Sequence, residues 1–392
     1  MSSILVMKLA FCIFKYFSFG GLERNFLRIT EACLARGHEI HIYTMDWQGR
    51  QPDGLKVTEV PFSGFSNHGR CRTFAGNLKK LLENEKYDLV VGFNRMTGLD
   101  LYYAADVCYV LDIAGRRSFL SRLTPRYKVY SAFEKAVFGL DSQTYIMYLS
   151  EIEKQNYIAV YGTDESRFHY LPPGIDKKRI RSAAGRETRQ RIRQEFKLNA
   201  EDKMLLMVGS DFARKGVSRS IQALAALPDN LRHRARLFII GRGNAKPFEK
   251  LSQRLGLDGH VHFMGGRDDV ERFLAAADLL LHPAISENTG NAIVEALVAG
   301  VPVMATDVCG YGFHVKEAEA GYLVRGDPFR QEEMNKLLSA MLSSPEIETW
   351  RKNAIHYSNN TDLYSRPRVA SDIIERIAEM KSTGRNITRK TN

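Results

Sequence analysis

The sequence lacks the signatures of secretion, of membrane insertion and of metal or redox chemistry. No apolar run is long enough to cross a bilayer, and the N-terminal MSSILVMKLAFCIF is broken by Lys8 and has no small-residue cleavage site. The five cysteines are scattered, odd in number and without the paired spacing of a zinc site or redox motif. We therefore expect a protein of a reducing cytoplasm that is neither secreted nor integral to a membrane.

Repeats and low-complexity tracts are also missing, as is typical of a soluble globular protein. Hydrophobic residues make up 44% and charged residues 26% of the 392 positions, close to average usage. A chain of this length exceeds what a single hydrophobic core usually supports, so two domains of ordinary size are expected.

The chain has an excess of positive charge, with a formal net charge of +11. Such a balance favours an anionic partner, which could be nucleic acid, a phosphorylated substrate or an acidic membrane face. Charge alone does not choose among them.

Short apolar runs alternate with helical patterns from end to end, which predicts an α/β fold with parallel sheets covered by helices. The expected strands are KLAFCIF, EIHIYTM, KVTEVPF, DLVVGF and TYIMYLS in the first half, and MLLMVG, LFIIG, VHFMG, LLLHP and VPVMAT in the second. Because LPPGI at 171–175 breaks any regular element, we expect doubly wound domains over 1–172 and 173–361. Residues 362–392 are expected to form a last helix, which crosses back to the first domain, and a loose tail.

Ligands of open parallel sheets bind beyond the carboxyl ends of the strands, where loops enter helices, so these junctions hold the candidate site. The first is KYFSFGGLERNFLRI, in which Gly20 and Gly21 open a helix. Free backbone N–H groups at that helix start could hold an anion. A tight turn without a ligand explains the glycine pair equally well.

The second junction is VGSDFARKGVSRSIQAL, where Arg214 and Lys215 stand together at a helix start. The helix dipole disfavours positive charge there, and an anion between the two cations would remove the conflict. A diphosphate suits this place, since Arg offers a planar fork and Lys a point charge. An ordinary solvated turn is the alternative.

The third junction is HPAISENTGNAIVEALVAG, where Glu287 lies on a loop and Asn288 or Thr289 can cap the next helix. Glu295 sits among apolar residues of that helix, and a buried carboxylate needs hydrogen-bond donors. Paired ribose hydroxyls would supply them, and Glu287 could meet the hydroxyls of a second sugar. An exposed position of Glu295 is the alternative. Together the junctions predict one ligand, a nucleoside diphosphate sugar.

The E-x7-E spacing of Glu287 and Glu295, with the GS-x3-RKG loop, resembles the retaining glycosyltransferases of family 4. Within that family the chain looks similar to the lipopolysaccharide core glucosyltransferases I, over nearly its whole length to about Arg366. The segments that carry this resemblance are KYFSFGGLERNFLRI, GFNRMTGLDLYYAADVCY, LPPGI, GSDFARKGVSRSI, and HPAISENTGNAIVEAL followed by VCGY. The resemblance implies the GT-B fold, in which two Rossmann-like domains face each other across a cleft.

The resemblance also implies an activity: transfer of glucose from UDP-glucose to a heptose of the lipopolysaccharide inner core, in α-1,3 linkage with retention of anomeric configuration. The enzyme would act as a peripheral protein on the cytoplasmic face of the inner membrane. No metal or other cofactor is expected, because cations of the protein take the metal's role. No carboxylate can be named as a nucleophile. Attack on the face from which UDP departs is the usual explanation for similar enzymes.

Carried over by motif, Glu295 would bind the ribose, and the donor sugar and phosphate would be held by Glu287 and the backbone of Asn288, Thr289 and Gly290. Arg214 and Lys215 would neutralise the departing diphosphate, so these two and Glu287 form the expected catalytic group.

Three further residues match donor-side positions of the family. Gly21 would approach the phosphate from the N-terminal domain, while Arg179 and Arg267 stand in LPPGIDKKR and GGRDDV. Among the positions that depart from the family pattern are two candidate site residues. Asn25 replaces a usual Asp, which keeps hydrogen bonds and loses charge, and the imidazole of the CGYGFH segment is moved one place to His314.

Residues 113–135, IAGRRSFLSRLTPRYKVYSAFEK, mix six basic residues and a single acid with apolar and aromatic residues. This mixture is typical of an interfacial contact with an anionic membrane. A helix packed on the sheet with its charges in water is the alternative.

Rival functions remain at this level. One is a transferase of another UDP-hexose or a nucleotide-sugar epimerase, and the non-enzymatic one is a basic nucleic-acid-binding protein. We expect no nucleic-acid partner, because the basic residues fall into separate patches without a stacking platform. The basic helix RETRQRIRQEF is accordingly expected to be a solvated surface face.

Overall fold

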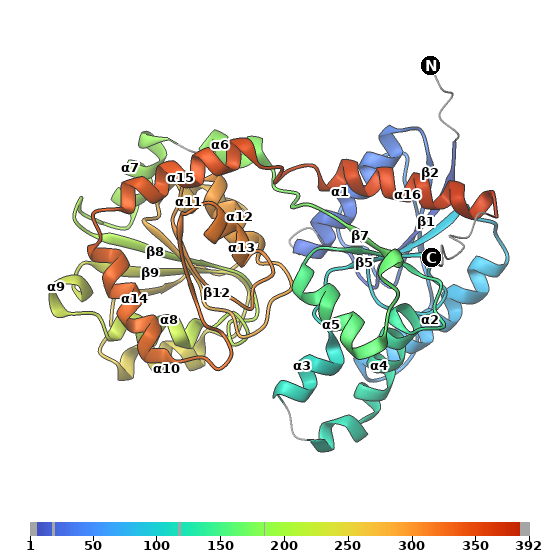
Figure 1. Ribbon diagram of the computed structural model, residues 1–392, viewed down its shortest axis with the longest axis horizontal. Helices are drawn as coiled ribbons and strands as arrows, with labels where there is room; N and C mark the ends of the chain where they lie inside the picture. Colours follow the sequence, from blue (N-terminus) through green and yellow to red (C-terminus); the bar gives the residue numbers. More distant parts are fainter. Residues whose placement is uncertain (1–5, 18–19, 117–118, 184, 385–392) are drawn as a thin grey trace, which may run out of the picture. The chain divides into compact units, whose positions relative to one another are not determined.

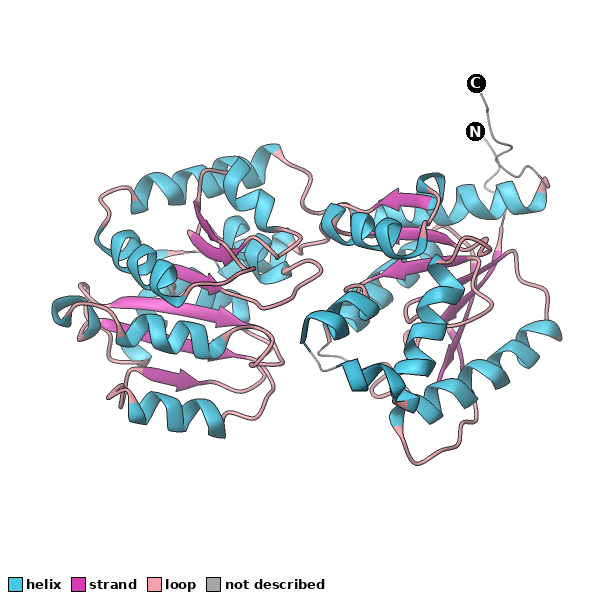
Figure 2. Ribbon diagram, turned by 60° about the horizontal axis from the view of Figure 1, so that its bottom comes forward, coloured by secondary structure: helices cyan, strands magenta, loops and turns pink. Residues whose placement is uncertain are grey.

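The computed structural model describes residues 6–17, 20–116, 119–183 and 185–384. The chain divides into two compact units, one of residues 1–174 with 365–392 and the other of residues 175–364. Each unit is a parallel sheet between two layers of helices (Figures 1 and 2).

The first unit has a seven-stranded sheet in the order β3-β2-β1-β4-β5-β6-β7, and every strand pair is parallel. Its strands are β1 (Lys8–Cys12), β2 (Glu39–Thr44), β3 (Lys56–Glu59), β4 (Leu89–Gly92), β5 (Leu101–Ala104), β6 (Tyr145–Tyr148) and β7 (Phe168–Tyr170). Its helices are α1 (Gly21–Ala35), α2 (Asn67–Glu83), α3 (Tyr109–Arg116), α4 (Pro125–Phe138), α5 (Glu151–Tyr161) and α16 (Arg366–Ser382), with 3-10 turns η1 (Phe119–Leu123) and η2 (Glu165–Arg167).

The layers of this unit follow from the pleat of its strands, whose side chains alternate between the two faces. In β1, Leu9 and Phe11 pack with residues of α1 and α16, whereas Ala10 and Cys12 pack with residues of α2 and α4. Figure 1 shows α1 and α16 together on one face of the sheet and α2 and α4 on the other.

The second unit has a six-stranded parallel sheet in the order β10-β9-β8-β11-β12-β13. Its strands are β8 (Lys203–Val208), β9 (Ala235–Ile240), β10 (Val261–Phe263), β11 (Leu279–His282), β12 (Val303–Thr306) and β13 (Gly321–Val324). Its helices are α6 (Lys177–Ala183), α7 (Arg186–Glu195), α8 (Val217–Ala225), α9 (Asp229–Arg232), α10 (Lys246–Arg254), α11 (Val270–Ala276), α12 (Asn291–Val298), α13 (Gly312–Glu317), α14 (Gln331–Ser343) and α15 (Ile347–Asn360).

The division between the units falls after Gly174, two residues later than the sequence indicates, and again between Tyr364 and Ser365. The chain passes between the units at these two places, and the two segments are joined by a backbone hydrogen bond. The N–H of Ile175 donates to the carbonyl of Leu363 at 2.9 Å. The last helix, α16, belongs to the first unit and packs on α1. The tail expected beyond Gly384 lies outside the described residues.

The basic helix α7 is less solvated than the sequence predicts. Arg189 and Arg193 both bind the buried carboxylate of Asp278, at 2.5 and 3.1 Å, while most of the other side chains of the helix are exposed. The prediction of a solvated helix is therefore wrong for its inner face, because Asp278 gives two of the guanidinium groups an internal partner.

The basic segment 113–135 spans α3, η1 and α4, with residues 117 and 118 outside the described part. Phe133 is buried in the core, and Tyr127 and Tyr130 are half-buried against Tyr109. The large apolar side chains that stay exposed are Leu120 and Leu123 of η1, at 69% and 62%. Over the described ranges of the chain, no helix has the length and hydropathy to cross a membrane.

Candidate active site

The second unit has a topological switch point between β8 and β11, the central strands of its sheet. The chain leaves β8 into α8 and leaves β11 into α12, and these two helices cover opposite faces of the sheet (Figure 1). The two loops, 209–216 and 283–290, touch through the N–H of Ile285 and the carbonyl of Arg214, at 2.8 Å. Ligands of doubly wound sheets bind at such a point.

Both helices at the switch point begin at a glycine in the left-handed region and have no side-chain cap. Gly216 precedes α8 with φ +75°, and Gly290 precedes α12 with φ +91°. The expected cap of α12 by Asn288 or Thr289 is therefore wrong, because the turn requires a positive φ at the position before the helix. The capping residues Gly216 and Gly290 thus offer no side-chain acceptor to the first N–H groups of the two helices, and such groups bind anions.

The carboxylate of Glu287 brings the two predicted cations together. Its Oε2 atom accepts hydrogen bonds from the ammonium group of Lys215 and from Nη1 of Arg214, the latter at 3.1 Å, and Nε2 of His282 lies 3.7 Å away. Asp211 binds the same guanidinium from another side, with Nε of Arg214 at 3.2 Å. The anion that relieves the repulsion between Arg214 and Lys215 is thus partly supplied by the protein.

The pKa values of this cluster follow from burial and from the opposed charges. Burial alone would raise the pKa of Glu287, but Lys215, the adjacent imidazole of His282 and Arg214 outweigh it and hold that pKa well below its usual range. Burial lowers the pKa of His282 despite the neighbouring carboxylate, so its imidazole is neutral near neutral pH. The pKa of Arg214 is raised, because Glu287 and Asp211 outweigh its burial.

The loop that carries Glu287 is held by hydrogen bonds from residues that the sequence analysis did not identify. Nη1 of Arg219 donates to the carbonyls of Pro283 and Ala284 at 3.1 and 3.0 Å, and the hydroxyl of Thr306 donates to Ala284 at 2.7 Å. A further bond runs from the N–H of Tyr311 to the carbonyl of Thr289. A sequence signal for these residues is weak, since only their tertiary contacts distinguish them from other polar residues.

Glu295 is half-buried on α12, and so is Asn291 four residues before it. Residues four apart lie on one face of a helix, so these two form a polar stripe on a helix whose other faces pack into the core. Glu295 is neither fully buried nor fully exposed. Asn288, on the loop before the helix, is 3% exposed.

Arg179 and Arg267 lie at another place in the unit, around the loop that follows β10. Nε of Arg179 donates to Glu271 at 3.0 Å, and its Nη2 donates to the carbonyl of Asp268. Arg267 forms a bidentate pair with Asp269, at 2.6 and 2.9 Å. The structure does not place Arg267 in contact with the Glu287 cluster.

In the first unit, Gly21 is the first residue of α1, and a Cβ atom there would have open space around it within 4 Å. The amide of Asn25 donates to the carbonyl of Gly21 at 2.9 Å. A carboxylate has no proton for this bond at neutral pH. Asn25 therefore makes a contact that the usual Asp could not make, and the expectation that an amide merely keeps the hydrogen bonds of the acid is incomplete.

His314 is a core residue, 3% exposed, on α13. Its Nδ1 is 2.7 Å from the hydroxyl of Tyr357, and that hydroxyl donates to Glu317 at 2.7 Å. Burial lowers the pKa of His314 to about 4. This histidine ties α13 to α15 in its neutral form.

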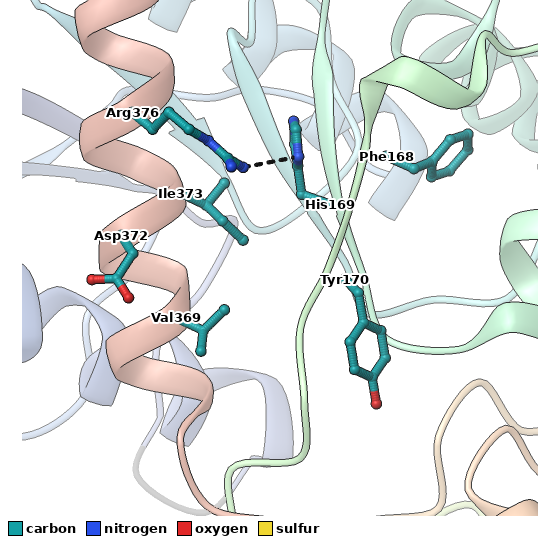
Figure 3. A pocket seen from close by; sticks show the side chains of 7 residues that line it. All are labelled: Phe168, His169, Tyr170, Val369, Asp372, Ile373 and Arg376. Atoms are coloured by element: carbon teal, nitrogen blue, oxygen red, sulfur yellow. Dashed lines mark hydrogen bonds between the residues drawn. The ribbon is translucent and has the colours of Figure 1, made fainter. Parts of the chain in front are cut away.

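The first unit also has a pocket of about 480 Å³ between the edge strand β7 and α16 (Figure 3). Arg376 donates to Nδ1 of His169 across it at 3.1 Å, and burial together with Arg376 lowers the pKa of His169 to about 4. None of the predicted site residues lines this pocket. In the described part of the chain, no three His, Cys, Asp or Glu side chains are grouped so as to hold a metal ion.

Comparison with known proteins places these features in a family. The description Glycosyltransferase Family 4 matches residues 19–179, and Glycosyl transferases group 1 matches residues 188–358. The lipopolysaccharide glucosyltransferase WaaG of Escherichia coli K12 is 44% identical over 369 residues, which cover 94% of this chain and 98% of WaaG.

Solved structures agree with this similarity. A crystal structure of WaaG, described as a glycosyltransferase involved in lipopolysaccharide biosynthesis, matches with a TM-score of 0.89 and 44% identity, covering 93% of this chain and 99% of that one. The structure of Anabaena HepE in complex with UDP and glucose matches with a TM-score of 0.72 over 95% of this chain and 100% of its own. At 17% identity, that second likeness concerns the fold alone. The chain therefore belongs to the WaaG family of glycosyltransferases and is itself a glycosyltransferase of the GT-B fold.

Proposed function

We propose that the protein is a retaining hexosyltransferase that moves glucose from UDP-glucose to a heptose of the lipopolysaccharide inner core, in α-1,3 linkage. The observation that carries this proposal is the convergence of Arg214, Lys215 and Glu287 at two uncapped helix starts. The 44% identity to a lipopolysaccharide glucosyltransferase supports the choice of sugar and acceptor class.

In this proposal the diphosphate lies against Arg214, Lys215 and the first N–H groups of α8 and α12. Helix starts and guanidinium forks both favour phosphate oxygens. Glu295, on the half-buried stripe of α12, accepts the ribose hydroxyls, and Glu287 accepts a hydroxyl of the glucose.

The reaction breaks the bond between C1 of glucose and the phosphate oxygen and forms a bond between C1 and the acceptor oxygen on the same face. The acceptor hydroxyl gives its proton to the departing phosphate. Charge grows on that phosphate as the bond breaks, so fixed cations lower the barrier, and each such contact is worth about 3 to 4 kcal/mol. The cations act in place of a metal, and we expect full activity in the presence of EDTA.

A donor and acceptor panel tests this function. Purified protein is incubated with UDP-glucose, UDP-galactose or UDP-N-acetylglucosamine and a defined heptose-terminated inner-core acceptor, and the linkage of the product is read by NMR. We expect an α-1,3-linked glucose from UDP-glucose alone. UDP release that does not depend on acceptor, or conversion of one donor into another, would contradict the proposal.

A second proposal concerns localisation: the protein is peripheral on the cytoplasmic face of the inner membrane, held there by α3, η1 and α4. Leu120 and Leu123 are exposed, and the exposed basic side chains of Arg126, Lys128 and Lys135 follow them on α4. Exposed apolar side chains beside cations suit the interface of an anionic bilayer.

Vesicle sedimentation tests the membrane proposal. The double variant Arg126→Glu with Lys128→Glu should lose binding to anionic vesicles. The matched variant Lys250→Glu with Arg254→Glu, on the exposed face of α10, changes the net charge equally and should keep binding. Equal sedimentation of the wild type with neutral and anionic vesicles would count against a charge-dependent contact.

A further inference from the structure

His282 is a buried residue whose polar edge faces the candidate site. It is the last residue of β11 and is 1% exposed, yet its Nε2 atom has no hydrogen-bond partner among the described residues. The atom is 3.7 Å from Oε2 of Glu287, and a Cβ atom added to Gly290 would be 3.5 Å from it. The imidazole therefore lies directly under the turn that runs from Glu287 to Gly290.

An unpaired buried polar group is costly, about 1 to 3 kcal/mol, because it has lost water without gaining a partner. Such groups in folded proteins call for an explanation, and one explanation is a partner that the group meets during function. Glu287 is the acceptor within reach: a movement of a few tenths of an ångström would make a charge-assisted hydrogen bond.

Only one of the two carboxylate oxygens of Glu287 forms polar contacts with the described residues around it. Its hydrogen bonds and ion pairs with described residues all end on Oε2, which takes Lys215, Arg214 and the approach of His282. The Oε1 atom is thereby left to accept a hydrogen bond from another molecule, and the side chain of Glu287 is 10% exposed.

The three groups around Oε2 differ in what else attracts them. Lys215 and Arg214 carry charge, so a diphosphate would draw both away from Glu287. His282 is neutral and enclosed, so a phosphate gives it little reason to move. It can hold Oε2 while the cations serve the leaving group.

We propose that His282 is a positioning residue for the donor sugar: its Nε2–H fixes Oε2 of Glu287, so that Oε1 is presented to a hydroxyl of the hexose. This inference rests on the proposed function, since it assigns the hexose of a UDP-hexose to Glu287. It predicts a residue that affects recognition of the sugar and leaves recognition of the nucleotide unchanged.

The test compares dissociation constants for UDP and UDP-glucose, measured by titration calorimetry, in the wild type, His282→Leu and His282→Gln. In the Leu variant we expect affinity for UDP-glucose to fall about tenfold or more, as for the loss of a hydrogen bond to a charged group. UDP affinity should stay within about twofold of wild type. Gln places an amide N–H close to the position of Nε2 and should restore most of the loss.

A matched control is His262→Leu, which changes a half-buried histidine of β10 that stacks on Phe238. It should leave the ratio of the two constants unchanged. Equal loss of UDP and UDP-glucose binding in His282→Leu would assign His282 a merely structural role and overturn the inference, as would Leu and Gln variants that bind UDP-glucose alike. Failure of the proposed function looks different: the wild type would then fail to bind UDP-glucose, and this outcome would overturn both.

Discussion

Lys215 is a charged residue that is both largely buried and paired with an acid. Its side chain is 13% exposed and its ammonium group binds Glu287. We predict that Lys215→Ala lowers kcat at least a hundredfold while the protein stays folded, because one fixed charge on the leaving phosphate is lost and Arg214 still partners Glu287. Steady-state kinetics and a thermal melt measure the two parts of this expectation. Lys352→Ala, at an exposed position of α15, should change neither kcat nor the melting temperature. Near-normal turnover in Lys215→Ala would contradict a catalytic role of Lys215.

His314 makes stability depend on pH. Its pKa is about 4 in the folded protein against a model value of 6.5, because burial penalises the imidazolium. The unfolded chain therefore binds the proton more tightly, so the full contribution to stability is present above pH 6.5 and is lost as pH falls toward 4. The loss is about 1.4 kcal/mol per pH unit for one such histidine.

The measurement is the free energy of unfolding between pH 7.5 and about 5, from urea titrations. His314→Gln should flatten the pH slope by close to one proton, although it also loses the bond to Tyr357. His356→Gln, an exposed histidine of α15, should keep the slope of the wild type. An unchanged slope in His314→Gln would show that this imidazole titrates alike in both states.

At the scale of elements, the site depends on the close approach of the two loops at the switch point. A Cβ atom at Gly216 would collide with the carbonyl oxygen of Pro283, which belongs to the backbone of the neighbouring loop. The loops can meet because the residue that caps α8 has no side chain. The left-handed backbone at Gly216 adds a second reason for glycine.

We predict that Gly216→Ala destabilises the second unit by more than about 2 kcal/mol and weakens UDP binding. Gly256→Ala is the control that distinguishes backbone strain from a steric clash. Gly256 also has a positive φ, of +67°, but a Cβ atom there would have open space around it. It should cost only about 1 kcal/mol and leave UDP affinity intact. Equal effects of the two substitutions on UDP binding would contradict the role of loop contact.

At the scale of the whole molecule, the first unit is built from both ends of the chain. Ile373, Ile374 and Ile377 of α16 join the core cluster of β1 and α1. Polar contacts fix the same helix at its edges, with Arg36 bound to Asp372 at 2.6 Å and His38 to Glu375 at 2.8 Å. The C-terminal helix is therefore part of the fold of the first unit.

Ile374→Ala should destabilise the first unit by about 2 to 5 kcal/mol, since the residue is fully buried and its loss leaves a cavity. Ile355→Ala, at a residue 39% exposed on α15 of the second unit, should change stability by less than about 0.5 kcal/mol. Calorimetry with and without UDP distinguishes the units, because UDP should raise the transition of the second unit only. A fall of that UDP-sensitive transition in Ile374→Ala would contradict the assignment of α16.

The sequence by itself determined the fold class, because buried parallel strands are continuous apolar runs that need no tertiary information to be seen. MLLMVG and LLLHP became β8 and β11, and the residues after them became the site loops. Three of the described strands were not predicted. β5 follows β4 without an intervening helix, β7 has three residues, and β13 begins at a glycine. These strands of three or four residues are too short for their hydrophobic pattern to be recognised in the sequence.

The tertiary structure alone decided how the predicted charges pair. Sequence spacing placed Glu287 before a helix and Arg214 beside Lys215, but it did not show that both cations end on the same carboxylate oxygen. It also gave no reason to single out His282 or Arg219, which matter only because β11 and α8 bring them under the Glu287 loop. Strands and helices arise from local periodicity, whereas these contacts join residues more than sixty positions apart or depend on a turn whose φ only the packed loops require.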